Sequence, residues 1–179
     1  MLKQIAVVSA VVLLSACSSF GNKKVEGKDS VTSEFMGGEI RITFNKEGQF
    51  ESMTASGSAR MTNTLPSGRE EAFIIAKLRA QQKMVEFMKN ELDSERFKKT
   101  VYESLQEGQT IGNQSNNEVN SKIVANVQED IKTKSRGILK GVHIESKSFN
   151  TETQTVLVVV KTGVKEITTA NQIRSLMGN

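Results

Sequence analysis

Residues 155–160 read TVLVVV, a continuous run of aliphatic, mostly β-branched side chains. Such residues are enriched in strands, and a run without polar alternation is typical of a strand that is buried on both faces. Residues 138–149 before it alternate weakly between apolar and polar, and Asn150-Thr151-Glu152-Thr153 supplies a turn. We therefore expect an antiparallel hairpin with a central strand at 155–160.

A second hairpin is predicted upstream. Residues 39–44 alternate polar and apolar, Asn45-Lys46-Glu47-Gly48 has turn chemistry, and residues 49–53 resume the extended pattern. Residues 55–59, Ala-Ser-Gly-Ser-Ala, carry only small side chains, so another backbone can approach closely there. The sequence thus predicts strands at both ends of the folded region.

The segment between the two hairpins has helical periodicity. A long helix is predicted over residues 69–92, about 36 Å at 1.5 Å per residue, and Ser67 with Glu70 forms a capping box at its start. Its apolar residues recur at helical spacing, at Phe73, Ala76, Ala80, Met84, Phe87 and Met88. A second helix, capped by Asp93 and Ser94, is expected to run to about Leu105.

Residues 107–117 are rich in Gly, Gln, Asn and Ser, which predicts a loop. Ser115 and Glu118 then form a second capping box, and a third helix is predicted to end near Gly137. Its apolar residues recur in steps of four, at Val119, Ile123, Val127 and Ile131. A short terminal helix is expected after Gly163. Together these patterns predict an α+β domain, with a small, mostly antiparallel sheet packed by a long helix and shorter helices.

The composition excludes several kinds of chemistry. The 179 residues include one Cys, one His, one Tyr and no Trp. A single Cys and a single His cannot form a zinc cluster or a structural disulfide, so we expect no metal and no cofactor. The formal net charge of +4 comes from 24 Lys and Arg against 20 Asp and Glu, without a dense basic block. Nucleic-acid binding therefore has little support.

The N-terminus resembles a bacterial lipoprotein signal. Lys3 precedes an apolar run at residues 5–13, which is shorter than the ~20 residues of a membrane-spanning helix. Leu14-Ser15-Ala16-Cys17 then matches a lipobox, in which small side chains fit the peptidase and the Cys sulfur accepts diacylglycerol. We expect residues 1–16 to be a signal peptide and Cys17 to be the lipidation site, carrying acyl chains such as palmitate. An ordinary secreted protein with an unpaired Cys is the alternative.

Residues 17–33 are mostly polar and small, which predicts a flexible tether and leaves 34–179 as a single folded domain. Two or three acyl chains anchor a protein stably, since each buried methylene contributes about 0.8 kcal/mol. Ser18 follows the Cys at the position where Asp is the usual inner-membrane retention signal. We therefore expect a chain that is lipid-anchored in the bacterial outer membrane.

Several of these motifs occur in the order that one family shows. The small-residue strand at 55–59 is followed by the Ala-containing helix, by Ser135-Arg136-Gly137-Ile138-Leu139-Lys140-Gly141-Val142 and by the strand at 156–160. The helix contributes Glu70, Glu71, Ala72, Ala76, Leu78 and Ala80. This order resembles the FlgP-like small outer-membrane lipoproteins, which have a G-x-A strand, an Ala-rich helix and a G-x-(L/I)-x-G-(V/A) strand before a final hairpin strand.

The resemblance covers roughly residues 50–161, and it departs from the family where alanines are replaced by Ile74, Ile75 and Gln81. It implies an α+β domain. In the best-known members of the family it also implies a ring or disk around the flagellar rod at the outer membrane.

No catalytic constellation emerges from the residues, and we expect no enzyme. His143 shares a strand face with Glu145, which fits a polar surface better than a general base. The carboxylate pairs Glu70-Glu71 and Glu129-Asp130 sit where helix caps and solvated faces carry acids. The long helix also carries cations that could meet lipid headgroups, although Glu86 and Glu91 interleave with them: Lys77, Arg79, Lys83 and Lys89.

Three hypotheses of function follow. The first is a structural or assembly lipoprotein of an envelope machine, with flagellar or other envelope proteins as possible partners. This protein would form homo-oligomers through exposed strand edges or the loop at 107–117. The second is a monomeric accessory lipoprotein that binds peptidoglycan, a lipid or a secretion component in an apolar cleft between the long helix and the sheet. The third is an envelope enzyme, which requires His143 and a carboxylate in one pocket.

Overall fold

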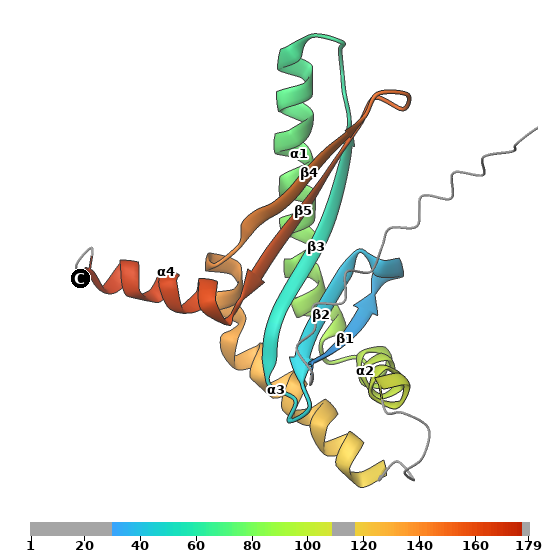
Figure 1. Ribbon diagram of the computed structural model, residues 1–179, viewed down its shortest axis with the longest axis vertical. Helices are drawn as coiled ribbons and strands as arrows, with labels where there is room; N and C mark the ends of the chain where they lie inside the picture. The colour runs from blue at the N-terminus through green and yellow to red at the C-terminus, as the bar shows by residue number, and fades with distance from the viewer. Residues whose placement is uncertain (1–29, 109–116, 177–179) are drawn as a thin grey trace, which may run out of the picture.

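A computed structural model describes residues 30–108 and 117–176 (Figure 1). Its strands are β1 (Ser30–Phe35), β2 (Ile40–Asn45), β3 (Phe50–Arg60), β4 (His143–Asn150) and β5 (Thr155–Gly163). Its helices are α1 (Pro66–Glu86), α2 (Glu95–Gly108), α3 (Asn117–Lys140) and α4 (Val164–Leu176), with the short helical segments η1 (Met36–Gly38) and η2 (Phe87–Glu91). The strands form one antiparallel sheet in the order β1-β2-β3-β5-β4, which confirms the predicted α+β fold.

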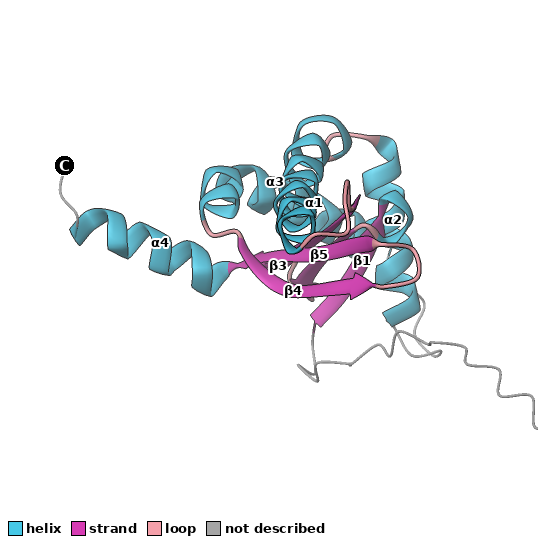
Figure 2. Ribbon diagram, turned by 90° about the horizontal axis from the view of Figure 1, so that it is seen from above, coloured by secondary structure: helices cyan, strands magenta, loops and turns pink. Residues whose placement is uncertain are grey.

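The strand predicted at 155–160 is β5, which lies between β3 and β4. Val156, Val158 and Val160 are fully buried, whereas Leu157 and Val159 are only half-buried. The prediction that both faces of this strand are buried is therefore wrong. Figure 2 gives the reason, because α1 and α3 lie on one side of the sheet and cover alternate residues of the strand.

The first hairpin is confirmed as β2 and β3, but the sheet begins earlier than the sequence indicates. β1 pairs with β2 from Ser30 onward, so residues 30–33, which we assigned to the tether, belong to the sheet. The Ser33 side chain is fully buried. Ser33 stands between Val31 and Phe35 on this strand and breaks the apolar alternation by which strands are found in a sequence, so β1 was not predicted.

The small residues of β3 allow α1 to lie directly on the sheet, as predicted. A Cβ placed on Gly57 would lie 2.2 Å from the carbonyl oxygen of Ala76 and 2.6 Å from the backbone nitrogen of Ala80, closer than van der Waals contact permits. The face of α1 toward the sheet buries Gly68, Ala72, Ala76, Ala80 and Met84. The helix axis is therefore held close to the central strand.

The predicted capping box at the start of α1 is wrong. The helix begins at Pro66, with Leu65 in an extended conformation at the N-cap and no side-chain cap hydrogen bond. Pro is favoured in the first turn of a helix because its fixed φ suits that turn and its missing N–H would be unpaired there anyway. The chain before it is fixed by Asn63, whose side-chain oxygen accepts a hydrogen bond from the Leu65 N–H at 3.0 Å.

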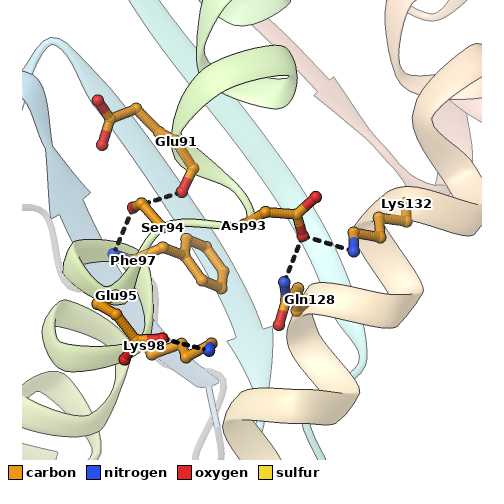
Figure 3. Close-up of polar contacts among 8 residues, drawn as sticks. All are labelled: Glu91, Asp93, Ser94, Glu95, Phe97, Lys98, Gln128 and Lys132. Carbon is orange, nitrogen blue, oxygen red and sulfur yellow. Dashed lines mark hydrogen bonds and ion pairs between the residues drawn. The ribbon is translucent and has the colours of Figure 1, made fainter.

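α2 begins as predicted. The Ser94 hydroxyl oxygen accepts a hydrogen bond from the Phe97 N–H at 3.0 Å and donates one to the Glu91 carbonyl at 2.7 Å (Figure 3). This cap directs the Phe97 ring into the core, where its centroid lies 5.4 Å from that of Phe35 and 6.1 Å from that of Phe87. The three rings join β1, η2 and α2, and each pair contributes about 0.5–1.5 kcal/mol beyond the area it buries.

The apolar stripe predicted for α3 is only partly correct. Val127 and Ile131 are fully buried, but Val119 is 48% exposed and Ile123 is half-buried. A step of four residues turns a helix by about 400°, so a strict i+4 series drifts around the surface and leaves the core. The buried residues follow a mean step closer to 3.6: Asn120, Val124, Val127, Ile131 and Ile138.

The end of α3 also differs from the prediction. The helix continues through Gly137 to Lys140, so the segment 135–142, which the resemblance assigns to a strand, is helical over most of its length. Ile138 is fully buried on the helix. A Cβ on Gly137 would lie 2.6 Å from Cγ2 of Ile167, so glycine lets α4 pack against this end of α3.

The predicted terminal helix is α4, and it projects away from the rest of the domain (Figures 1 and 2). Ile167 is buried near its start, whereas Val164 is 44% and Ile173 is 50% exposed. Only the first turns of α4 are therefore held by α3 and the sheet.

Candidate functional site

The lipidation site predicted at Cys17 lies outside the described residues, and so does Ser115 in the predicted loop. Signal peptide and lipid anchor therefore stay predictions. Within 30–108 and 117–176, no helix has the length and apolar character needed to cross a membrane.

His143 stands at the start of β4 with an exposed side chain, as predicted for a polar surface. It lies opposite Lys161 in the register of β4 and β5. The Lys161 ammonium binds the neighbouring Glu145 carboxylate, with an N–O distance of 3.2 Å. The carboxylate closest to His143 in sequence is therefore paired with a lysine.

The two carboxylate pairs lie on different helices, at the N-terminal end of α1 and in α3, rather than across one cleft. Glu71 accepts a hydrogen bond from the Thr62 hydroxyl at 3.2 Å. Asp130 accepts one from the Phe50 N–H at 2.7 Å and binds the Lys134 ammonium at 2.7 Å. Asp130 thus acts as a link between α3 and the start of β3.

A shallow recess lies beside Asp130, between α3 and the turn that joins β2 to β3. It is lined by Glu47, Gly48, Gln49, Asn126, Glu129, Asp130 and Thr133. The Asn126 amide donates a hydrogen bond to the Glu47 carbonyl at 3.1 Å, which joins α3 to the turn beside the recess. No group of three His, Cys, Asp or Glu side chains among the described residues is arranged to hold a metal ion.

The apolar cleft that we expected between the long helix and the sheet is filled by the helix itself. Gly57 and Ala76 bring the two backbones into contact there. The second recess near the helices lies between α2 and α3 instead, and it is lined by Glu95, Lys98, Lys99, Tyr102, Ser121 and Val124. Neither recess lies between α1 and β3.

Two of the four cations considered for lipid headgroups, three in α1 and Lys89 in η2, are turned toward the sheet. Arg79 donates a hydrogen bond to the Ser58 carbonyl at 2.7 Å. Lys83 pairs with Glu39 at 2.6 Å, and its side chain is only 23% exposed. These two side chains fix the helix on the sheet, so the cationic face available to headgroups is smaller than the sequence indicates.

Asp93, expected as part of the α2 cap, joins two helices instead. Its carboxylate accepts hydrogen bonds from Lys132 and Gln128, both on α3 and both at 2.5 Å (Figure 3). The Lys132 hydrogen bond, followed by that of Gln128, holds the pKa of Asp93 below its ordinary value. Asp93 therefore connects the α2 junction to α3 as long as it is ionised.

The outer edge of β4 carries features that disfavour pairing with another strand. The β4–β5 register shifts between Ile144 and Ser146, so Glu145 is an extra residue in β4. The neighbouring Lys147 is exposed, with its ammonium 5.4 Å from the Phe73 ring centroid. Bulges and lysines on edge strands oppose edge-to-edge association.

The outward face of α1 carries an apolar stripe that the sequence analysis missed. We use the name α1 stripe for Ile74, Leu78 and Val85, which are 61%, 57% and 44% exposed. At 100° per residue these side chains fall within about 40° of one another around the helix, opposite the face that holds Ala76. Single exposed aliphatic residues are ordinary, but three in one row define a candidate interaction surface.

A signal for this stripe was present in the sequence. Leu78 and Val85 follow Ile74 at four and eleven residues, a spacing that keeps all three on one face of a helix. The surface could be assigned only once the buried face of α1 was known.

The geometry defines a class of protein, an α+β domain whose long helix presents an apolar surface away from the sheet. Compared with known proteins, the chain matches no family model, and neither a curated protein nor a solved structure was found to be similar to it.

Proposed function

We propose that this chain is a non-enzymatic outer-membrane lipoprotein with a structural or assembly role in an envelope machine, such as a flagellar outer-membrane ring. The observation that carries the proposal is the α1 stripe, an exposed aliphatic row on the rigid long helix of a folded domain. Association between proteins is driven mainly by burial of such apolar surface. The lipobox at Cys17 adds the predicted membrane anchor.

The polar side chains of the domain support this proposal. Asp93, Asp130 and Glu145 each pair with a lysine inside the domain, and Arg79 binds a β3 carbonyl. These groups join helices and strands to one another. Such contacts fit a scaffold protein that binds its partners through its apolar surface.

Two measurements test the proposal. The tagged full chain is crosslinked in living cells, and the proteins that copurify with it from the outer membrane are identified by mass spectrometry. Recovery of flagellar ring or other envelope-machine components together with self-crosslinks is expected. Recovery from a soluble fraction without such partners contradicts the assembly role.

The anchor is tested separately with Cys17→Ser, because the cysteine sulfur is the acceptor of the lipid. The variant is expected to accumulate as an uncleaved precursor without acyl chains, as measured by intact-protein mass. Ser18→Ala is the matched control and should be processed normally. A lipidated mature mass for Cys17→Ser contradicts the lipobox assignment.

A further inference from the structure

We infer that the α1 stripe is the contact surface between two copies of this chain, with the two α1 helices packed antiparallel about a twofold axis. The inference deepens the self-association in the proposed function by naming its surface and its occupant. Ile74 and Val85 lie near the two ends of the stripe, about 16 Å apart along the helix at 1.5 Å per residue. A twofold axis near the centre brings Ile74 of one copy against Val85 of the other.

The face opposite the sheet is accessible over the length needed. Figure 1 shows the N-terminal half of α1 standing clear of α2 and α3. Ile74 in this half and Leu78 and Val85 in the other half all have exposed side chains. The opposite side of the helix is fixed on the sheet by Ala76 and Ala80. Two copies can therefore pack α1 against α1 as rigid bodies, without any change of structure within either domain.

Charge complementarity sets the direction of the pair. Glu70 and Glu71 are exposed at the N-terminal end of the stripe, and Lys89 is exposed beyond its C-terminal end. Three other charged groups near the ends are engaged within the domain. Arg69 lies over the Phe149 ring at 4.8 Å, Lys83 pairs with Glu39, and Glu86 accepts a hydrogen bond from the Gln82 amide at 2.7 Å. An antiparallel pair with Ile74 against Val85 places Glu70 of each helix beside Lys89 of the other.

The same charges oppose a parallel pair, which would place Glu70 beside Glu70 and Lys89 beside Lys89. Antiparallel packing also aligns the helix dipoles favourably, because each N-terminus then lies beside a C-terminus. At the centre of the stripe, Gln81 takes the position between Leu78 and Val85. A polar residue in an apolar seam fixes the register of two helices at some cost in stability.

Two other surfaces of the described residues, the β4 edge and α4, fit a second copy less well. The β4 edge carries a bulge and Lys147. On the projecting helix α4, Val164 and Ile173 are nine residues apart, which places them about 180° apart around the helix axis. They therefore form no common apolar face, whereas the three residues of the α1 stripe do.

Disulfide crosslinking of the full chain in detergent micelles tests both contact and direction. Ile74→Cys and Val85→Cys proteins are expected to crosslink when mixed, while each alone stays at the level of the wild-type chain, whose only cysteine is Cys17. Leu78→Cys, close to the twofold axis, is expected to crosslink with itself. Self-crosslinking of Ile74→Cys overturns the antiparallel direction, and no crosslink at any of the three positions overturns the contact.

Two further variants separate this surface from the rest of the proposed function. Leu78→Glu is expected to abolish the dimer measured by analytical ultracentrifugation, whereas Val119→Glu, at a similarly exposed site on α3, should leave it intact. Glu70→Lys and Lys89→Glu should each weaken the dimer, and the double variant should restore it. If Leu78→Glu instead loses binding to vesicles but not dimerisation, the stripe contacts lipid and the inference is wrong.

The outcome for the surface is distinct from the outcome for the function. A chain that still forms oligomers after Leu78→Glu keeps the assembly role and overturns the α1 contact. If the chain dimerises through α1 but no envelope partner copurifies with it from cells, the α1 contact stands and the assembly role is wrong.

Discussion

Gly57 and Ala76 define the closest approach between the sheet and the long helix. A Cβ on Gly57 would lie 2.2 Å from the Ala76 carbonyl oxygen. Since that oxygen belongs to the helix backbone, no side-chain rotation relieves the contact. The position of α1 therefore depends on the absence of a single methyl group in β3.

Gly57→Val is expected to destabilise the domain by about 3 kcal/mol, at the upper end of the usual cost of overpacking. Ser58→Val is the matched control, because Ser58 is exposed on the neighbouring position and a β-branched residue suits a strand. Urea unfolding followed by circular dichroism compares the two variants. Equal stability of both would show that α1 does not lie against β3 at this point.

Val158→Asp is expected to unfold the domain, because it places an unpaired charge on a fully buried position of β5. Val159→Asp is the control on the opposite face, where the side chain is half-buried. The second variant should fold with a smaller loss, since its carboxylate can reach water. Thermal unfolding of the two purified proteins distinguishes them, and an equal loss contradicts the one-sided packing of the sheet.

Asp130→Ala is expected to destabilise the domain by about 2 kcal/mol, in the range for hydrogen bonds to charged groups. The change removes the acceptor of the Phe50 N–H, so α3 and the start of β3 lose their link. Glu129→Ala, the exposed neighbour, should have little effect. Hydrogen exchange at the Phe50 amide gives a local readout, and unchanged protection there would refute the link.

Acid is expected to weaken the contact of Asp93 with α3. The pKa of Asp93 is lowered in the folded state, first by the Lys132 hydrogen bond, so the ionised carboxylate adds stability above its ordinary pKa of 3.8. That contribution is lost as the pH falls through the lower, folded-state pKa. The stability difference between wild type and Asp93→Asn should therefore shrink on acidification, although it is small for an exposed group.

Urea unfolding at neutral pH and at about pH 3, below the ordinary pKa of Asp, measures this difference. Lys132→Met should reduce the stability difference at neutral pH, because the hydrogen bond that lowers the Asp93 pKa most is lost. A difference between wild type and Asp93→Asn that grows as the pH falls contradicts the assignment.

The elements with strong periodicity could be predicted from the sequence, whereas those fixed by tertiary contacts could not. The apolar alternation of β2, the valines of β5 and the alanines of α1 all have local signatures. β1 lacks a clear signature, since Ser33 interrupts the alternation of Val31 and Phe35 and the strand is fixed by pairing with β2. The end of α3 was missed because Gly137 was taken as a helix stop, whereas it serves as a contact for Ile167.

The α1 stripe illustrates a different limit. Ile74 and Leu78 have the same apolar chemistry as a core residue, and nothing in their own sequence neighbourhood says which face of the helix is outward. That information comes from Gly57, far away in the sequence, which selects the face of α1 that meets the sheet. A surface of this kind becomes visible only after the core is assigned.

The strand order separates the first described strand, at the edge of the sheet, from the helix that carries the α1 stripe. The described chain begins at Ser30 in the edge strand β1, whereas α1 lies over β3. The anchor that we propose at Cys17 would therefore be joined to the domain at this edge of the sheet and not at α1. Such an anchor would confine neighbouring copies to one membrane surface and raise their local concentration. A pair of α1 helices that is weak in dilute solution would then form more readily.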